Sequence, residues 1–250
     1  MSKSAKAKLL FLLSVFTEDP SDWIDVFSSP LPRISGYPKR DKTIKKAVAD
    51  LLNEHKLDYK KDKETILIRP TKTAFAELAQ SFPFYRSFTV AWDAKFRLVT
   101  YDVAENKRQE RDSLRRILQL HHLQKWQNSV WITPYPVEEL LKKLKSLDLD
   151  RYIQVLELKI ISSTPGVEKF VEKVWNISKL QQDYQTLFRE LSKIVAKPKG
   201  KRRMIDIFRK SFLTYEKLLE ADPGLPSELL PKDWQGMRVR KMLKRLQRLI

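Results

Sequence analysis

Apolar positions in the first third of the chain predict helices followed by a hairpin. The run at 6–16 is apolar nearly all round, which is typical of a buried helix. Asp41 can cap a second helix, in which apolar residues recur at intervals of three and four while the opposite face stays polar. Two short apolar runs then flank a charged stretch, as in a hairpin with a charged tip. The predicted elements are helices at 6–16, 41–55 and 73–81 and strands at 57–59 and 65–68.

The middle third alternates in the order strand, helix, strand, strand, helix, strand. This βαββαβ order is the ferredoxin-like plan, in which two helices cover one face of an antiparallel sheet. The other face is left for a partner, such as a second copy of the chain. The predicted elements are strands at 96–103, 123–126, 129–133 and 152–161 and helices at 107–120 and 137–147.

The last third is helical, and the whole pattern predicts an α+β multidomain chain. A Lys/Gly/Pro linker at 197–203 and a proline-rich loop at 222–236 separate its helices. We read the loop as an architectural clasp that Leu229, Leu230 and Trp234 pin into the helical domain. The predicted helices are 167–177, 179–195, 203–219 and 237–250. The predicted domains are 1–86, 87–166 and 167–250.

The first domain has the element order of a winged helix-turn-helix. In such domains one helix enters the DNA major groove while lysines of a hairpin, the wing, touch phosphates beside it. The alternative is a small α+β domain with a merely solvated charged face. Only residues 23–27, among prolines, could form the helix expected before the recognition helix. The predicted DNA contacts are Lys42, Lys45, Lys46 and Asn53 on the helix and Lys60, Lys61 and Lys63 on the wing.

Charge and composition narrow the function classes. Lysine and arginine number 49 against 31 acidic residues, and the net charge of +18 favours a polyanionic partner. The alternative is a lysine-rich composition without such a partner. Cysteine is absent and histidine occurs three times, which excludes disulfides and cysteine-ligated zinc. No glycine-rich nucleotide-binding motif and no apolar run of membrane-spanning length occurs. We therefore expect a cytoplasmic protein with no cofactor and no membrane partner.

Asp102 is the one candidate for metal-dependent chemistry. It ends the most strand-like run of the chain, and a magnesium-dependent nuclease needs carboxylates to hold its ion. No second acidic residue of the chain obviously pairs with it, although a dimer could supply another copy. The favoured interpretation is structural, because a carboxylate near a helix start is stabilised by free N–H groups and the helix dipole.

Four motifs of the sequence resemble those of a known family, the PaaX-type transcriptional repressors. The resemblance covers nearly the whole chain. It rests on ADPGLPSELLPKDWQG at 221–236, on WDAKFRLVTYDV at 92–103, on SVWITP at 129–134 and on WNI at 175–177 with Tyr184 and Phe188. One departure is the segment 17–40, where the family has a long apolar second helix. The middle domain also resembles the small CRISPR-associated adaptation nuclease subunit.

The resemblance to PaaX-type repressors implies three parts and a regulated activity. The parts are a winged helix DNA-binding domain, a ferredoxin-like middle domain and a helical C-terminal domain. The implied activity is repression that an acyl- or aryl-coenzyme A effector relieves.

The leading hypothesis from the sequence is therefore a regulator that is not an enzyme and has no catalytic or metal site. We expect a homodimer that binds double-stranded DNA. The alternatives are a metal-dependent nuclease that uses Asp102 and a nucleic-acid-associated scaffold that no longer reads sequence.

Overall fold

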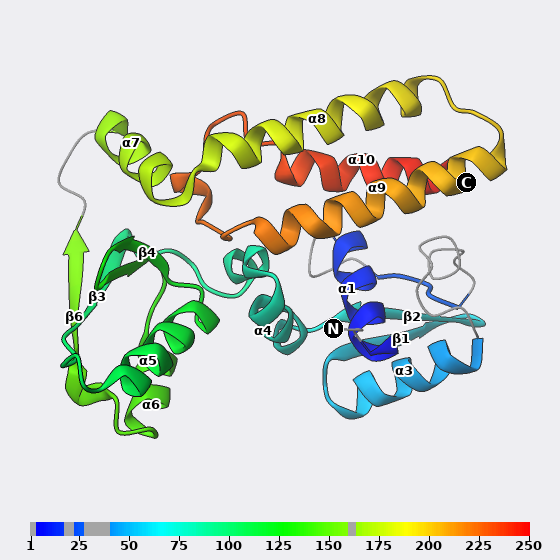
Figure 1. Ribbon diagram of the computed structural model, residues 1–250. Helices are drawn as coiled ribbons and strands as arrows, with labels where there is room; N and C mark the ends of the chain where they lie inside the picture. Colours follow the sequence, from blue (N-terminus) through cyan, green and yellow to red (C-terminus); the bar gives the residue numbers. More distant parts are fainter. Residues whose placement is uncertain (1–3, 18–22, 28–40, 160–163) are drawn as a thin grey trace. The chain divides into compact units, whose positions relative to one another are not determined.

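The computed structural model describes residues 4–17, 23–27, 41–159 and 164–250, and the chain divides into two compact units (Figure 1). The first unit comprises Met1–Thr89, Lys179–Asp222 and Asp233–Ile250. The second comprises Val90–Ser178 and Pro223–Lys232. The amino-terminal elements thus share a unit with the helices of the carboxyl-terminal third. No helix among the described residues is long and apolar enough to cross a membrane.

The first unit is built around the apolar first helix. Every side chain of α1 (Ala5–Phe16) from Leu9 onward is buried, as its pattern predicts. Its faces are covered by helices from both ends of the chain, which share one apolar core with it. Phe11 illustrates this, because its ring lies 4.5 Å from Phe82 and 5.7 Å from Phe212. The helices that share this core are α3 (Asp41–Asn53), α4 (Lys72–Ser81), η1 (Pro83–Phe88), α8 (Ile177–Ala196), α9 (Lys201–Ala221) and α10 (Gly236–Arg248).

A buried arginine joins the last helix to the first. Arg240 of α10 is 1% exposed, and its Nε donates to the carbonyl oxygen of Val15 at 2.8 Å. Its Nη2 donates to the carbonyl oxygens of Ser14 and Thr17. The last carbonyls of a helix have no partners within the helix, so this guanidinium satisfies them where water cannot. The ring of Phe88 lies 5.3 Å from the guanidinium carbon.

The hairpin predicted after α3 is present and longer than expected. Strands β1 (Leu57–Asp62) and β2 (Thr65–Pro70) pair antiparallel from Leu57 opposite Pro70 to Asp62 opposite Thr65. Lys63 turns the chain with a φ of 53°.

The interpretation of residues 23–27 as a possible helix is wrong. Ile24 forms an antiparallel bridge with Ile68 instead, through two backbone hydrogen bonds of 2.9 Å. A backbone whose N–H and C=O both pair with β2 cannot also make helical bonds. Residues 18–22 and 28–40 of the atypical segment lie outside the described residues.

The second unit contains the predicted βαββαβ order. Its four strands form one antiparallel sheet in the order β4-β5-β3-β6, which is the ferredoxin-like topology (Figure 1). Val99 and Tyr101 point from the sheet into a core with Leu114, Leu118 and Leu140 of the two helices. The elements are β3 (Lys95–Tyr101), α5 (Arg108–Leu120), β4 (Gln124–Gln127), β5 (Val130–Thr133), α6 (Glu138–Lys145), η2 (Asp150–Tyr152) and β6 (Ile153–Lys159).

The other face of this sheet is covered in part by α7 (Thr164–Trp175). Phe170 and Trp175 lie 5.6 and 6.1 Å from Phe96, which belongs to β3. The helix predicted at 167–177 therefore packs on the sheet rather than among the carboxyl-terminal helices. On β6, Leu156 and Leu158 stay 53% and 38% exposed. An apolar part of the face thus remains open among the described residues, as expected.

The Trp-Asp…Arg string holds the start of β3 together. Arg97 is buried, and its guanidinium donates to both oxygens of Asp93, at 2.8 and 2.5 Å, and to Glu157 at 3.1 Å. The hydrogen bonds from Arg97 lower the pKa of the Asp93 carboxyl. Trp92 closes the same turn, since its indole N–H donates to the carbonyl of Lys95 at 3.0 Å. These residues are structural.

The proline-rich loop is divided between the units. Residues Pro223–Lys232 belong with the sheet domain, where the Tyr135 hydroxyl donates to the carbonyl of Gly224 and η3 (Ser227–Leu229) packs on α7. The segment with Leu229 thus packs on α7, which covers most of the helix predicted at 167–177, rather than on α8, α9 or α10. Trp234 does pack on α8, edge-on to Tyr184 at 5.3 Å.

Candidate nucleic-acid interface

Helix α3 packs its apolar face against α1 and therefore presents its basic face to solvent. Ile44, Val48 and Leu51 are buried in the shared core. Residues three or four positions apart lie on one face of a helix, so the residues between them point to solvent. All four side chains predicted to contact DNA from this helix are exposed: Lys42, Lys45, Lys46 and Asn53.

The hairpin places its lysines on two different faces. Successive residues of a strand alternate between faces, so Lys60 and Lys61 point in opposite directions. Lys60 lies over the ring of Trp23, with its Nζ 4.8 Å from the ring centre, and Arg69 lies 4.6 Å from the same ring. Lys61 shares the opposite face with exposed apolar side chains. Lys63 is exposed at the tip. The three predicted hairpin contacts therefore do not form one surface.

The six predicted lysines lack acidic partners among the described residues, although Lys60 lies over the ring of Trp23. Lys56, between the helix and the hairpin, is the contrast: its Nζ lies 2.5 Å from Glu54 and also pairs with Glu77. The hydrogen bond from Lys56 lowers the pKa of the Glu54 carboxyl. A lysine without an internal partner remains available to a phosphate.

Two exposed apolar residues of the hairpin escaped the sequence analysis. Tyr59 is 65% exposed and Ile66 is 43% exposed, on the same face as Lys61. That face points inward near Leu57 and Ile68, which are buried, but the strands extend beyond the core toward the tip. The two-residue period places Tyr59 and Ile66 on this face, but it does not show where the core ends. Trp23 was also missed, because a lone tryptophan before a proline-rich segment carries no periodic signal.

Asp102 is exposed in the loop after β3. Its backbone N–H donates to the carbonyl of Tyr152 at 3.0 Å. Lys107 occupies the N-cap position of α5 and makes no side-chain cap bond, so Asp102 does not cap this helix. Among the described residues, no group of three or more histidine and acidic side chains could hold a metal ion.

Comparisons with known proteins identify the two carboxyl-terminal parts. Residues 89–169 match the PaaX protein central Cas2-like domain, and residues 175–250 match the PaaX-like protein C-terminal domain. No curated protein sequence matches the chain. Among solved structures, the uncharacterized protein Rv0674 from Mycobacterium tuberculosis is similar at 18% identity and a TM-score of 0.49, over 97% of this chain and 95% of that one. Because the two domain matches together cover more than half of its residues, the chain belongs to the PaaX family.

Proposed function

We propose that this protein is a DNA-binding transcriptional repressor. PaaX-type proteins are a family of regulators, and the first unit offers the parts such a protein needs. The observation that carries the proposal is the exposed lysine face of α3, which forms no salt bridge within the described residues and is followed directly by a basic hairpin. The bridge between Ile24 and Ile68 supports a winged helix-turn-helix, since it adds a third extended segment to the hairpin beside the helix.

In this proposal α3 enters the major groove. A groove about 12 Å wide admits a helix, and Asn53 is suited to pair with an adenine edge. Lys42, Lys45 and Lys46 hold phosphates on the groove walls, so they position the protein without reading the sequence. The hairpin touches the backbone beside the groove as a wing. The overall charge of +18 adds attraction to any duplex.

Dimerisation, effector control and a cytoplasmic location complete the proposal. A homodimer would place two copies of α3 on a palindromic site. The exposed Leu156 and Leu158 on the open sheet face support pairing through the second unit. Family membership supports release from DNA by an acyl-coenzyme A.

The experiment is a binding titration with DNA from upstream of the protein's own gene and with a shuffled duplex of equal length. The parent should prefer the upstream DNA, and the triple change of Lys42, Lys45 and Lys46 to alanine should weaken binding to both. The log–log salt slope should also flatten by about 0.9 per lost phosphate contact. The control changes Lys210 and Lys217, exposed residues of α9, to alanine. Equal losses in control and test variants would remove α3 from the interface.

A further inference from the structure

The turn between α8 and α9 carries a dense run of exposed basic residues. Five of the seven residues at 197–203 are lysine or arginine, and no acidic residue occurs between Glu190 and Asp206. In the described part of the chain none of the five side chains forms a salt bridge, whereas Arg209, further along α9, lies 3.9 Å from Asp206. The five exposed residues, called here the α8–α9 basic turn, are Lys197, Lys199, Lys201, Arg202 and Arg203.

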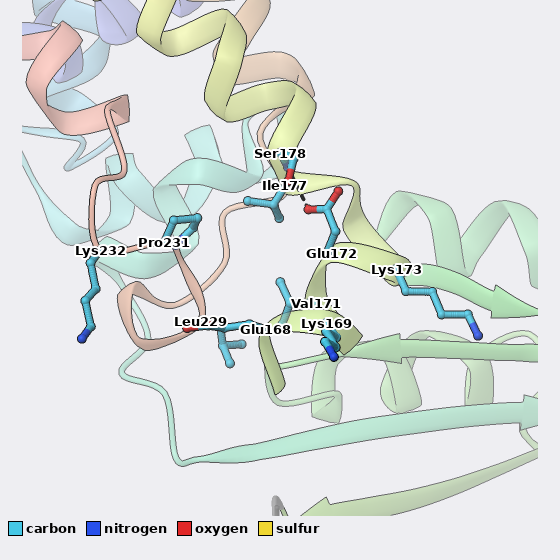
Figure 2. A pocket seen from close by; sticks show the side chains of 10 residues that line it. All are labelled: Glu168, Lys169, Val171, Glu172, Lys173, Ile177, Ser178, Leu229, Pro231 and Lys232. Atoms are coloured by element: carbon cyan, nitrogen blue, oxygen red, sulfur yellow. Dashed lines mark hydrogen bonds between the residues drawn. The ribbon is translucent and has the colours of Figure 1, made fainter. Parts of the chain in front are cut away.

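The stability of α9 does not explain these charges. The N-terminus of a helix carries free N–H groups and a positive partial charge, so acidic side chains stabilise it and basic ones destabilise it. Helix α8 follows this rule, because the Glu172 carboxylate accepts the backbone N–H of Ser178 in its first turn at 2.9 Å, as the dashed line in Figure 2 shows. Helix α9 instead begins with three cations after Gly200, which has no side chain to cap it. A polyanion bound at the turn would reverse this unfavourable effect.

The basic turn has a fixed place in the first unit. Leu191 before it and Met204 after it are both 0% exposed, in the core that α3 also shares. In Figure 1 the connection from α8 to α9 lies at the right-hand end of this unit, as do the tip of the hairpin and the start of α3. A duplex that passes this end of the unit can therefore meet the turn as well as the helix and the hairpin.

We infer that the α8–α9 basic turn is a second contact surface for the backbone of the same DNA duplex. Lysine and arginine bind phosphates whatever the base, so this surface adds affinity and position rather than sequence reading. Residues 197–203 include no aromatic side chain on which bases of a single strand could stack. They also offer no apolar helix face for a membrane surface. The inference rests on the proposed function and extends the interface beyond the winged helix elements.

The first experiment measures DNA binding over a series of salt concentrations. In Lys199→Gln/Lys201→Gln/Arg203→Gln, binding to the upstream duplex should weaken about tenfold or more, and the log–log salt slope should flatten by about 0.9 per lost phosphate contact. The matched control, Lys210→Gln/Lys217→Gln/Lys241→Gln, removes the same charge from exposed positions of α9 and α10 and should keep the parent slope. An unchanged slope in the turn variant, or equal flattening in both variants, overturns the inference.

Two further measurements separate charge from folding. The urea midpoint of the turn variant should equal or exceed that of the parent, because the start of α9 loses unfavourable charges. The variant Lys199→Arg/Lys201→Arg/Arg203→Lys keeps every charge and should bind DNA like the parent. Loss of binding in this variant as well would assign the effect to the shape of the turn and overturn the role of its charge.

A combined variant distinguishes this inference from the proposed function. Changing both the turn and the three lysines of α3 should flatten the salt slope by the sum of the separate effects, since each set contacts its own phosphates. Flattening by the α3 change alone overturns the inference and leaves the proposed function standing. A parent that binds no duplex contradicts the proposed function itself. Binding to phosphatidylglycerol vesicles that the turn variant loses, with DNA binding unchanged, assigns the turn to a membrane surface and overturns the duplex.

Discussion

Arg240 joins the last helix to the first through hydrogen bonds of its buried side chain. Its guanidinium satisfies the carbonyl oxygens at the end of α1 from a fully buried position. Removing it leaves these acceptors unpaired, and buried unpaired groups cost about 1–3 kcal/mol each. Arg240→Met should therefore lower the free energy of unfolding by about 3 kcal/mol or more, measured by urea titration. Arg238→Met, an exposed change on the same helix, should have little effect. Similar losses in both would assign the effect to helix propensity instead.

The buried hydroxyl of Tyr85 makes the stability of the first unit depend on pH in the alkaline range. Burial raises the pKa of its hydroxyl to about 12, although the nearby Arg240 opposes this rise. Burial also raises the pKa of Tyr184 and Tyr215. A raised folded-state pKa stabilises the fold below the unfolded value of 10.0, and this contribution is lost as the pH rises toward 12.

The urea midpoint should therefore fall between pH 10 and 12, where the unfolded tyrosines ionise first. In Tyr85→Phe the unfolding free energy should fall less steeply with pH, by the slope that the release of about one proton produces. The change also removes the hydrogen bond from the Ser14 hydroxyl. A pH dependence identical to that of the parent would show that Tyr85 ionises equally in both states.

A substitution of Asp102 tests the alternative that the protein is a nuclease. The residue is exposed, and among the described residues no acidic cluster suited to a metal includes it. Asp102→Ala should leave DNA binding unchanged, and the parent should not cleave duplex DNA in the presence of magnesium. Cleavage by the parent that disappears in the variant would favour the nuclease.

Among the elements, the hairpin gives the sharpest prediction. Lys60 is held over Trp23, whereas Lys61 shares its face with exposed Tyr59 and Ile66. Only one face of a hairpin can contact a duplex backbone at a time. Of the two lysines, Lys61 has no contact with an aromatic ring among the described residues, so we expect its face to meet the DNA. Lys61→Ala should therefore flatten the salt slope by about 0.9 and Lys60→Ala should not. Equal effects of the two changes would mean that only the tip approaches DNA.

Local pattern predicted these elements well because their spacing carries the information. The boundaries of β3 and α5 lie within two residues of those expected, since strands alternate with a period of two and helices with 3.6. The exposed lysines of α3 followed from the same period. The single bridge of Ile24 did not, because its partner, Ile68, is distant in sequence. The opposite faces of Lys60 and Lys61 could have been read from the alternation.

At the scale of the molecule, the pairing of segments could not be predicted from local spacing. Periodicity shows that α1 and α9 each have an apolar face, but it does not show that Phe11 meets Phe212. The three-domain division at 1–86, 87–166 and 167–250 thus remains a prediction about folding units. The apolar side chains shared by both ends of the chain argue against its first member being independent.

A fragment of residues 1–89 should therefore fold poorly. Without α9 and α10 the aromatic surface of α1 is exposed, and a small domain has few other apolar contacts to replace them. The fragment should lack a cooperative urea transition, measured by circular dichroism, and addition of a fragment of residues 179–250 should restore it. Cooperative unfolding of 1–89 alone would establish the independent domain.

The bond from Arg240 to Val15 also has a consequence for synthesis. The two residues are 225 positions apart, and a ribosome adds about 5–20 residues per second, so the first helix waits roughly 10–45 s for its cap. During that time the apolar stretch Leu9–Phe16 lacks its final cover and is a natural substrate for chaperones. A chain that terminates before α10 never completes the unit that carries the lysine face of α3. Premature termination should therefore yield polypeptides that are degraded before they can occupy DNA.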